Sequence, residues 1–251
     1  MAEGPSPSDA SGDDRSEMSL WDHLDELRSV LLRSVIAIFL GAAAVYAFSG
    51  PLLDLLVTRT AGEAQFLKPM EGFAVRIKLS LILGLMLTLP YVLHQIWSFV
   101  VPGLLQRERR YVLPLVVSST GLFLLGAAFS SFLLTPTIVR FLMGFATENI
   151  AGRLAISYLL DFFIKMALAC GLLFQLPLVV AILSLFEILT PQFLIGKWRH
   201  AMVIILIIAA VVTPSDAASQ LFLGGPVILL YFVSIAVSKA IWRRKGERKD
   251  G

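Results

Sequence analysis

The stretch LSLILGLMLTLPYVLHQIWSFVV, residues 79–101, decides the fold class of this chain. It contains no Asp, Glu, Lys or Arg. About 20 apolar residues, at ~1.5 Å rise per residue, span the ~30 Å hydrocarbon layer of a bilayer, so we expect a transmembrane helix here. Comparable apolar segments precede and follow it. The sequence therefore predicts an all-α, polytopic membrane protein with six transmembrane helices.

The other five predicted spans differ in length. They cover approximately residues 30–48, 112–134, 159–185, 201–212 and 217–237. The fifth corresponds to only ~18 Å of helix, and Gly224-Gly225-Pro226 interrupts the sixth. We expect these last two helices to be short and to thin the membrane locally, or to lie in a water-accessible hollow. The alternative is a re-entrant hairpin that does not cross.

The composition excludes several other classes of protein. Hydrophobic residues make up 57% of the 251 residues and charged residues 16%, whereas soluble domains are about 45–50% apolar and about 25% charged. An ordinary soluble enzyme, a disordered chain and a disulfide-rich secreted module are therefore excluded. The net charge of +3 is too small to indicate nucleic-acid binding. A single cysteine, Cys170, excludes an intrachain disulfide and a cysteine-based metal cluster.

Two polar tails are expected to flank a membrane domain of residues 19–240. Residues 1–18 are acidic and rich in Ser, Gly and Pro, so we expect them to be disordered. Ser19 is predicted to begin an amphipathic helix at the membrane surface. The tail of residues 241–251 is basic and is expected to bind the anionic cytoplasmic leaflet.

The positions of the basic residues predict the orientation. With six crossings and a cytoplasmic N-terminus, fourteen of the 21 Lys and Arg residues fall on the cytoplasmic side. Cytoplasmic loops carry an excess of Lys and Arg. Both termini are therefore expected in the cytoplasm.

The sequence contains no recognisable catalytic or cofactor motif. It has no GxxxxGK[ST] loop for nucleotide phosphates, no HExxH zinc motif and no GxSxG nucleophile motif. His23, His94 and His200 lie in separate segments without metal-ligand spacing. We therefore expect no enzyme activity, no cofactor and no metal, and an energy source for any transport that is external or an ion gradient.

Two acidic residues beside predicted spans are candidate binding residues. Glu26 lies on the polar face of the surface helix, and Glu108 precedes the third span. Both fall on the predicted cytoplasmic side. Two carboxylates there could receive two guanidinium groups, because Arg–carboxylate pairing is planar and often bidentate. The alternative is local pairing, of Glu26 with Arg33 and of Glu108 with the arginines that flank it.

Four ordered blocks of this sequence resemble the TatC family, the membrane receptor core of the twin-arginine protein translocase. Residues 20–28 (LWDHLDELR) match the family pattern HLxELR, and residues 90–104 (PYVLHQIWSFVVPGL) match PxxxxQxWxFxxP. Residues 108–110 (ERR) match E[RK][RK], and residues 213–220 (TPSDAASQ) match TPxDxxSQ. The resemblance covers about residues 19–240. It implies a curved, glove-like arrangement of six helices in the cell inner (plasma) membrane.

The resemblance also implies functional residues. It implies that twin-arginine signal peptides of folded proteins bind at Glu26, Glu108, Phe99, Arg28 and His23. It implies partner-binding or structural roles in the membrane for Gln175, Pro177, Asp216 and Gln220. We expect Asp216 to cap the sixth helix or to bond to backbone there.

The partners follow from the resemblance as well. It implies a TatB-like single-span protein, many TatA-like subunits, a homo-oligomer within a receptor complex, and export driven by the proton-motive force. One residue departs from the family pattern, in which an acidic residue often stands in the fourth span. Gln175 can donate hydrogen bonds within the bundle or to a partner, but it cannot relay a proton.

Two other functions remain as alternatives. A secondary transporter for a small solute would place Gln175 and the broken last span near a pocket, but it predicts an internal repeat, and none is visible between residues 19–134 and 135–240. An insertase or assembly scaffold would leave Glu26 and Glu108 unexplained.

Overall fold

The computed structural model describes most of the chain. The described residues are 11–61, 64–104, 112–145, 154–213 and 217–249. Side chains are described within the ranges 24–61, 64–99, 113–145, 154–213 and 217–243.

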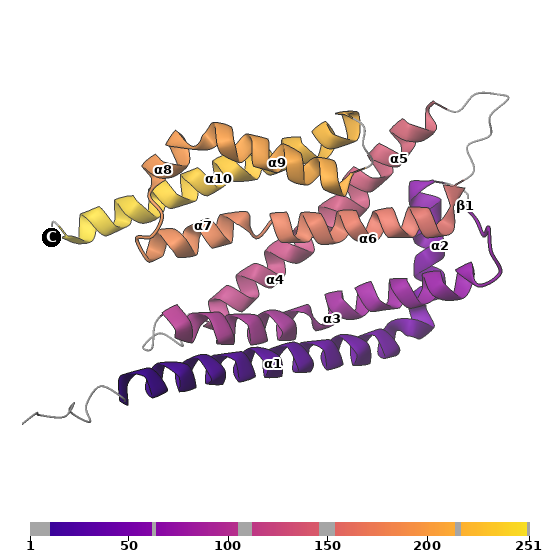
Figure 1. Ribbon diagram of the computed structural model, residues 1–251. Coiled ribbons are helices and arrows are strands. Elements are labelled where there is room, and N and C mark those ends of the chain that lie inside the picture. Colours follow the sequence, from indigo (N-terminus) through magenta and orange to yellow (C-terminus); the bar gives the residue numbers. More distant parts are fainter. Residues whose placement is uncertain (1–10, 62–63, 105–111, 146–153, 214–216, 250–251) are drawn as a thin grey trace, which may run out of the picture.

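The first half of the described chain forms two long antiparallel helices joined at one end. In order, the elements are α1 (Ser11–Val45), the 3-10 turn η1 (Tyr46–Phe48), α2 (Ser49–Thr60), β1 (Ala64–Gln65) and α3 (Glu71–Leu104). Figure 1 shows α1 and α3 side by side, whereas α2 turns away across the far end of α1. A Cβ on Gly41 or Gly84 would collide with the backbone of the facing helix. These glycines therefore let α1 and α3 pack closely.

The second half contains shorter and more tilted helices. They are α4 (Val112–Phe129), the π-helical segment η3 (Ser130–Leu134), α5 (Thr135–Met143), β2 (Leu154–Ala155), α6 (Ile156–Leu173), α7 (Leu176–Leu185), α8 (Pro191–Gly196), α9 (Trp198–Val212) and α10 (Ala217–Lys249). α4, η3 and α5 form one continuous path across the other helices (Figure 1). Pro136 lacks a backbone N–H and cannot donate the regular helical hydrogen bond. The π-helical segment just before it accommodates the missing bond.

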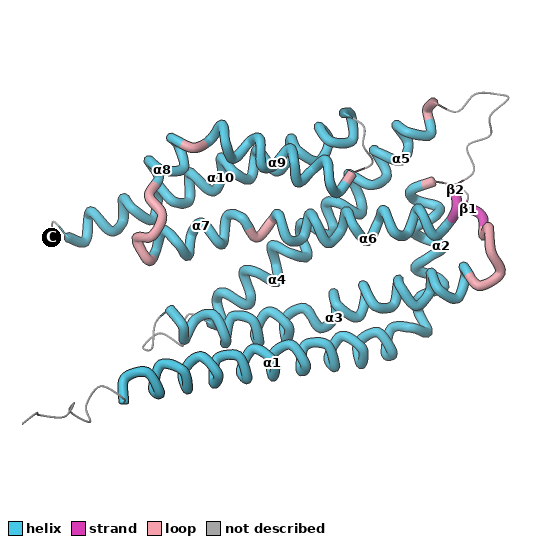
Figure 2. The backbone as a smooth tube through the Cα atoms, in the orientation of Figure 1, coloured by secondary structure: helices cyan, strands magenta, loops and turns pink. Residues whose placement is uncertain are grey.

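A short strand pair closes one end of the molecule. β1 and β2 run parallel, with Ala64 beside Leu154 and Gln65 beside Ala155 (Figure 2). The pair joins the segment before α3 to the segment before α6. We call this end of the molecule the strand end.

Three hydrophobic clusters hold the described helices together, and two of them are larger than the third. One of the two larger clusters lies between α2, α3, α5 and α6 and includes Val75 and Leu160. The other lies between α6, α7, α9 and α10 and includes Met166 and Leu223. None of the described α1 side chains belongs to either cluster. α1 is therefore held mainly by its contact with α3.

The predicted all-α membrane fold is confirmed. Within the described residues, five helical segments are long and apolar enough to cross a membrane, namely Leu24–Thr60, Glu71–Phe99, Leu113–Met143, Ile156–Leu185 and Ala217–Arg243. α9 is apolar but only 15 residues long, as the sequence predicts. The chain is therefore a multi-pass membrane protein with five long apolar segments and a shorter sixth.

The last helix corrects one expectation. We expect a short, interrupted helix from the sequence, but α10 continues for 33 residues with Pro226 inside it. Proline and glycine are tolerated in transmembrane helices, because local adjustments satisfy the freed backbone groups. Gly224 is a packing position, since a Cβ there would approach the side chain of Leu206 in α9. Gly224 therefore serves the α9–α10 contact, and the Gly224-Gly225-Pro226 segment does not break the helix.

The first helix also differs from expectation. It begins at Ser11, within the predicted disordered tail of residues 1–18, and not at Ser19.

Candidate functional site

Two of the candidate binding residues lie at the end of the molecule opposite the strand end. Because α1 and α3 are antiparallel, the N-terminal part of α1 lies beside the C-terminal part of α3 (Figure 1). This places Glu26 of α1 and Phe99 of α3 at the same end. We call the surface formed by residues 24–33 and 95–99 the rim. The side chain of Glu26 is exposed, whereas that of Phe99 is half-buried.

The carboxylate of Glu26 is exposed. Among the side chains that the structure describes, it forms no hydrogen bond or ion pair, so the alternative pairing with Arg33 is not formed. Arg28 follows two residues later on the same helix, and residues at this spacing do not face each other. The carboxylate is thus available to a ligand from outside the molecule.

Arg28 lies on a different side of α1. It is exposed and contributes to a shallow hollow, whose lining residues are Asp25, Arg28, Ser29, Leu32, Arg33 and Ile36. The hollow combines two guanidinium groups and one carboxylate with apolar side chains, so its net charge is positive.

Three other predicted positions lie outside the described residues. Glu108 falls between α3 and α4, and Asp216 falls between α9 and α10. For His23 the helical backbone is described but the side chain is not. The end of α3 and the start of α4, which flank Glu108, both lie at the rim end (Figure 1). Roles for these three residues remain predictions.

A hydrogen-bond network behind the rim connects three helices. The Trp97 Nε1–H donates to Ser119 Oγ at 3.0 Å, and the Ser119 hydroxyl donates to the carbonyl oxygen of Val116 at 3.1 Å. Gln175 Nε2 donates to the carbonyl oxygen of Ser119 at 2.8 Å. Ser119 is completely buried. It therefore joins α3, α4 and the junction of α6 with α7.

Sequence reasoning missed Ser119. Trp97 belongs to a recognised block, but a small hydroxyl residue in the apolar α4 carries no periodic or motif signal. Only the tertiary contact identifies it.

Gln175 and Pro177 lie where the fourth span changes direction. α6 ends at Leu173 and α7 begins at Leu176, with Pro177 in its first turn and buried. Proline removes a backbone donor and clashes with the preceding turn, so a break occurs just before it. The Gln175 amide then reaches Ser119 across the interface with α4. The structure thus places Gln175 in an intramolecular contact.

Gln220 connects the last two helices. Its Nε2 donates to the carbonyl oxygen of Leu206 at 2.9 Å, and the Thr213 hydroxyl donates to Ala209 at 2.9 Å. The Gln220 bond holds α9 against the start of α10, whereas the Thr213 bond lies within the C-terminal end of α9. They are structural contacts within the chain.

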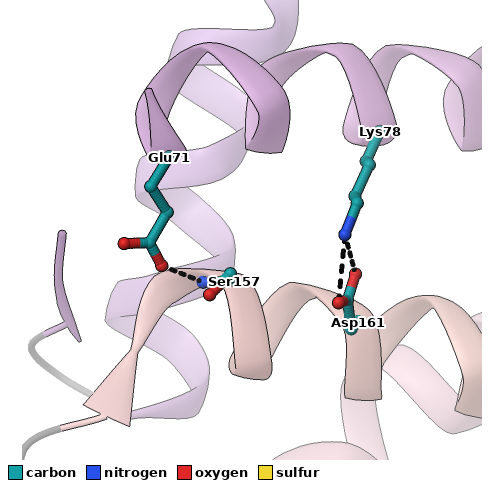
Figure 3. A network of polar contacts seen from close by, with 4 residues as sticks. All are labelled: Glu71, Lys78, Ser157 and Asp161. Atoms are coloured by element: carbon teal, nitrogen blue, oxygen red, sulfur yellow. Dashed lines mark hydrogen bonds and ion pairs between the residues drawn. The ribbon is translucent and has the colours of Figure 1, made fainter. Parts of the chain in front are cut away.

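The strand end contains charged contacts that sequence reasoning also missed. Glu71 accepts the backbone N–H groups of Leu67 at 2.6 Å, Lys68 at 3.2 Å and Ser157 at 3.0 Å. Lys78 Nζ lies 2.7 Å and 3.0 Å from the two carboxylate oxygens of Asp161 (Figure 3). Both contacts join α3 to the start of α6. For the Lys78–Asp161 pair the sequence does contain a signal, because both residues are charged and lie within or beside apolar segments.

Within the described residues, no group of three or more His, Cys, Asp and Glu side chains could hold a metal ion. The candidate functional groups at the two ends of the molecule are charged and hydrogen-bonding side chains. The rim holds the exposed carboxylate of Glu26, which has no partner among the described side chains, whereas the Glu71 and Asp161 carboxylates at the strand end are paired.

Comparison with known proteins identifies one family. The model for TatC, the Sec-independent protein translocase protein, matches residues 22–226. The TatC protein of Carboxydothermus hydrogenoformans is 36% identical over 238 residues, which is 92% of this chain and 98% of that protein. The TatC protein of Aquifex aeolicus is 32% identical over 237 residues, with the same coverage of 92% and 98%.

Solved structures agree with the sequence comparisons. A crystal structure of the twin arginine translocase receptor TatC superposes with a TM-score of 0.77 at 31% identity, covering 87% of this chain and 99% of that one. A second crystal structure of that receptor, in DDM, also gives 0.77 at 31% identity. The similarity therefore extends over nearly the whole membrane domain.

Proposed function

This chain belongs to the TatC family of Sec-independent protein translocase proteins, and we propose that it is the receptor and core subunit of a twin-arginine translocase. Its similarity to a solved twin arginine translocase receptor over most of both chains supports the proposal. In this role the protein binds the signal peptides of folded proteins and organises their export across the membrane.

The rim is the proposed binding site for the paired arginines of the signal peptide. The observation that carries this assignment is the exposed Glu26 carboxylate, which has no partner among the described side chains. A guanidinium group can donate two parallel hydrogen bonds to such a carboxylate. Phe99 offers an aromatic surface at the same end. Glu108 is proposed as the second carboxylate, from its position between the two helices that meet at the rim end.

The proposed complex contains further proteins. TatA-like and TatB-like single-span proteins and additional copies of this chain are its expected partners, and the proton-motive force is the expected energy source. The sequence has no P-loop for a nucleotide, which is compatible with that source. We place the rim and both termini on the cytoplasmic side of the inner membrane, because most basic residues fall on that side.

Signal-peptide affinity tests the proposal directly. Glu26→Ala and Glu108→Ala are each expected to weaken binding of a twin-arginine peptide by roughly ten- to a hundredfold, because a hydrogen bond to a charged group contributes about 1.5–3 kcal/mol. Lys in place of either Glu should weaken binding further through repulsion. The measurement is peptide binding to purified protein, with equal amounts of each folded variant.

Asp54→Ala is the matched control. Asp54 is an exposed carboxylate on α2, at the strand end of the molecule. Its removal should leave peptide binding unchanged. Full binding by both Glu variants would reject the rim as the site.

A further inference from the structure

One face of α6 is open along the first half of the fourth span. Tyr158, Asp161, Lys165 and Leu172 are spaced by three, four and seven residues, so they lie on the same side of the helix. Tyr158 is 75% exposed and Leu172 is 69% exposed. Lys165, between them, is exposed as well.

This face carries two charged groups within an apolar span. Asp161 pairs with Lys78 of α3, and the two side chains remain 43% and 46% exposed (Figure 3). Lys165 forms no ion pair or hydrogen bond among the side chains that the structure describes. Lys78, Asp161 and Lys165 therefore carry a net charge of one positive unit. An unpaired charge inside a bilayer is costly and indicates a functional group.

The depth of these groups matches the boundary between headgroups and acyl chains. The segment Ile156–Leu185 has 30 residues, or about 45 Å of helix, which exceeds the ~30 Å hydrocarbon layer. If the span is centred, Asp161 lies near the boundary and Lys165 about one turn deeper. Tyr158 lies on the outer side of both, where aromatic side chains gather in membrane proteins. A lysine at this depth extends its ammonium group toward the boundary.

We propose that Lys165, together with the Lys78–Asp161 pair, binds the phosphate group of a phospholipid in the leaflet at the strand end. A phosphate carries the negative charge that the three side chains lack. Lysine binds phosphate as a point charge, and basic groups between transmembrane helices bind lipid headgroups. The exposed Leu172, deeper on the same face, provides an apolar surface for the acyl chains, which a free anion would not occupy.

Lipid binding to the purified full-length protein in detergent micelles tests this site. The probes are phosphatidylglycerol, diacylglycerol without a phosphate, and inorganic phosphate, with bound lipid measured by native mass spectrometry. Lys165→Met should weaken phosphatidylglycerol binding about tenfold, or about 1.4 kcal/mol. Lys165→Arg should retain it. Lys68→Met, which removes an exposed lysine outside the span, is the control and should bind as the unmodified protein does.

Asp161→Asn is a second test, in which the expected result is tighter binding. Misfolding would not produce tighter binding. It removes the carboxylate that repels a phosphate and releases Lys78, so phosphatidylglycerol should bind more tightly. Diacylglycerol should not bind, and inorganic phosphate should not displace the lipid. Unchanged binding in Lys165→Met, unchanged or weaker binding in Asp161→Asn, or displacement by inorganic phosphate would each overturn the proposal.

Discussion

Glu26 at the rim and the pair Glu71 and Asp161 at the strand end use their carboxylates in opposite ways. At the strand end, Glu71 accepts three backbone N–H groups and Asp161 pairs with Lys78, so these acids fix α3 against α6. At the rim, Glu26 is exposed and has no partner among the described side chains. A satisfied carboxylate stabilises the fold, whereas an unsatisfied one can receive a ligand.

The two ends also differ in how they are held. The strand end is tied by a strand pair, by ionic contacts and by a hydrophobic cluster. The rim depends on the packing of α1 against α3, because none of the described α1 side chains enters the two main clusters. Substitutions that perturb one end at a time show whether the two ends behave independently.

The largest expected effect comes from the close approach of α1 and α3. In Gly84→Leu the new side chain must displace the backbone near Ala42. We expect about 3 kcal/mol of destabilisation, since overpacking typically costs 1–3 kcal/mol, together with loss of peptide binding at the rim. Gly121→Leu is the control, because a Cβ there has no atom within 4 Å. Unfolding in denaturing detergent measures the stability of both variants. Equal losses of stability would show that the close approach of α1 and α3 at Gly84 is not required.

Glu71→Ala should lower thermal stability by less than Gly84→Leu. It leaves the N–H groups of Leu67, Lys68 and Ser157 without their acceptor. Glu71→Gln should be intermediate, because its single carbonyl oxygen can replace only one of the two carboxylate oxygens. The melting temperature in micelles is the measurement. Peptide binding at the rim should be unchanged in the folded fraction, and a parallel loss of binding would show that the two ends are coupled.

The Trp97–Ser119 contact should give a smaller effect. Ser119→Ala removes the acceptor of the Trp97 indole N–H in a buried position, which should cost about 1–2 kcal/mol. Ser131→Ala is a suitable control, because the described bond of the Ser131 hydroxyl runs to the carbonyl oxygen of Ala127 one turn earlier, and its loss should destabilise the protein less than Ser119→Ala does. Similar unfolding free energies for both variants would show that the Trp97–Ser119 network does not stabilise the protein.

Much of the fold follows from the sequence because hydropathy and helix rise are local properties. The apolar segments and the short α9 derive from them, whereas the close packing of α1 against α3 depends on the facing Gly41 and Gly84. The length of α10 does not derive from these local properties, because local residue preferences predict a break at Gly224-Gly225-Pro226, whereas in the folded chain the helix continues through Pro226.

The candidate site is predictable to a lesser degree. A charge beside a span, such as Glu26, is visible in the sequence, and so are Asp161 and Lys165 within one. The partners of Glu71 are backbone N–H groups of distant segments, and Ser119 is one hydroxyl residue among several in an apolar helix. No residue pattern specifies such contacts, since they arise from how the helices pack.

A double-mutant cycle between Glu26 and the paired arginines of a signal peptide tests whether the rim recognises the arginines directly. Peptide affinity would be measured for the unmodified protein and for Glu26→Ala, each with the natural peptide and with one arginine replaced by alanine. If Glu26 binds that guanidinium group, either change alone removes the pairing, and the coupling energy should be at least about 1 kcal/mol. Additive losses for both arginines would contradict direct recognition at the rim.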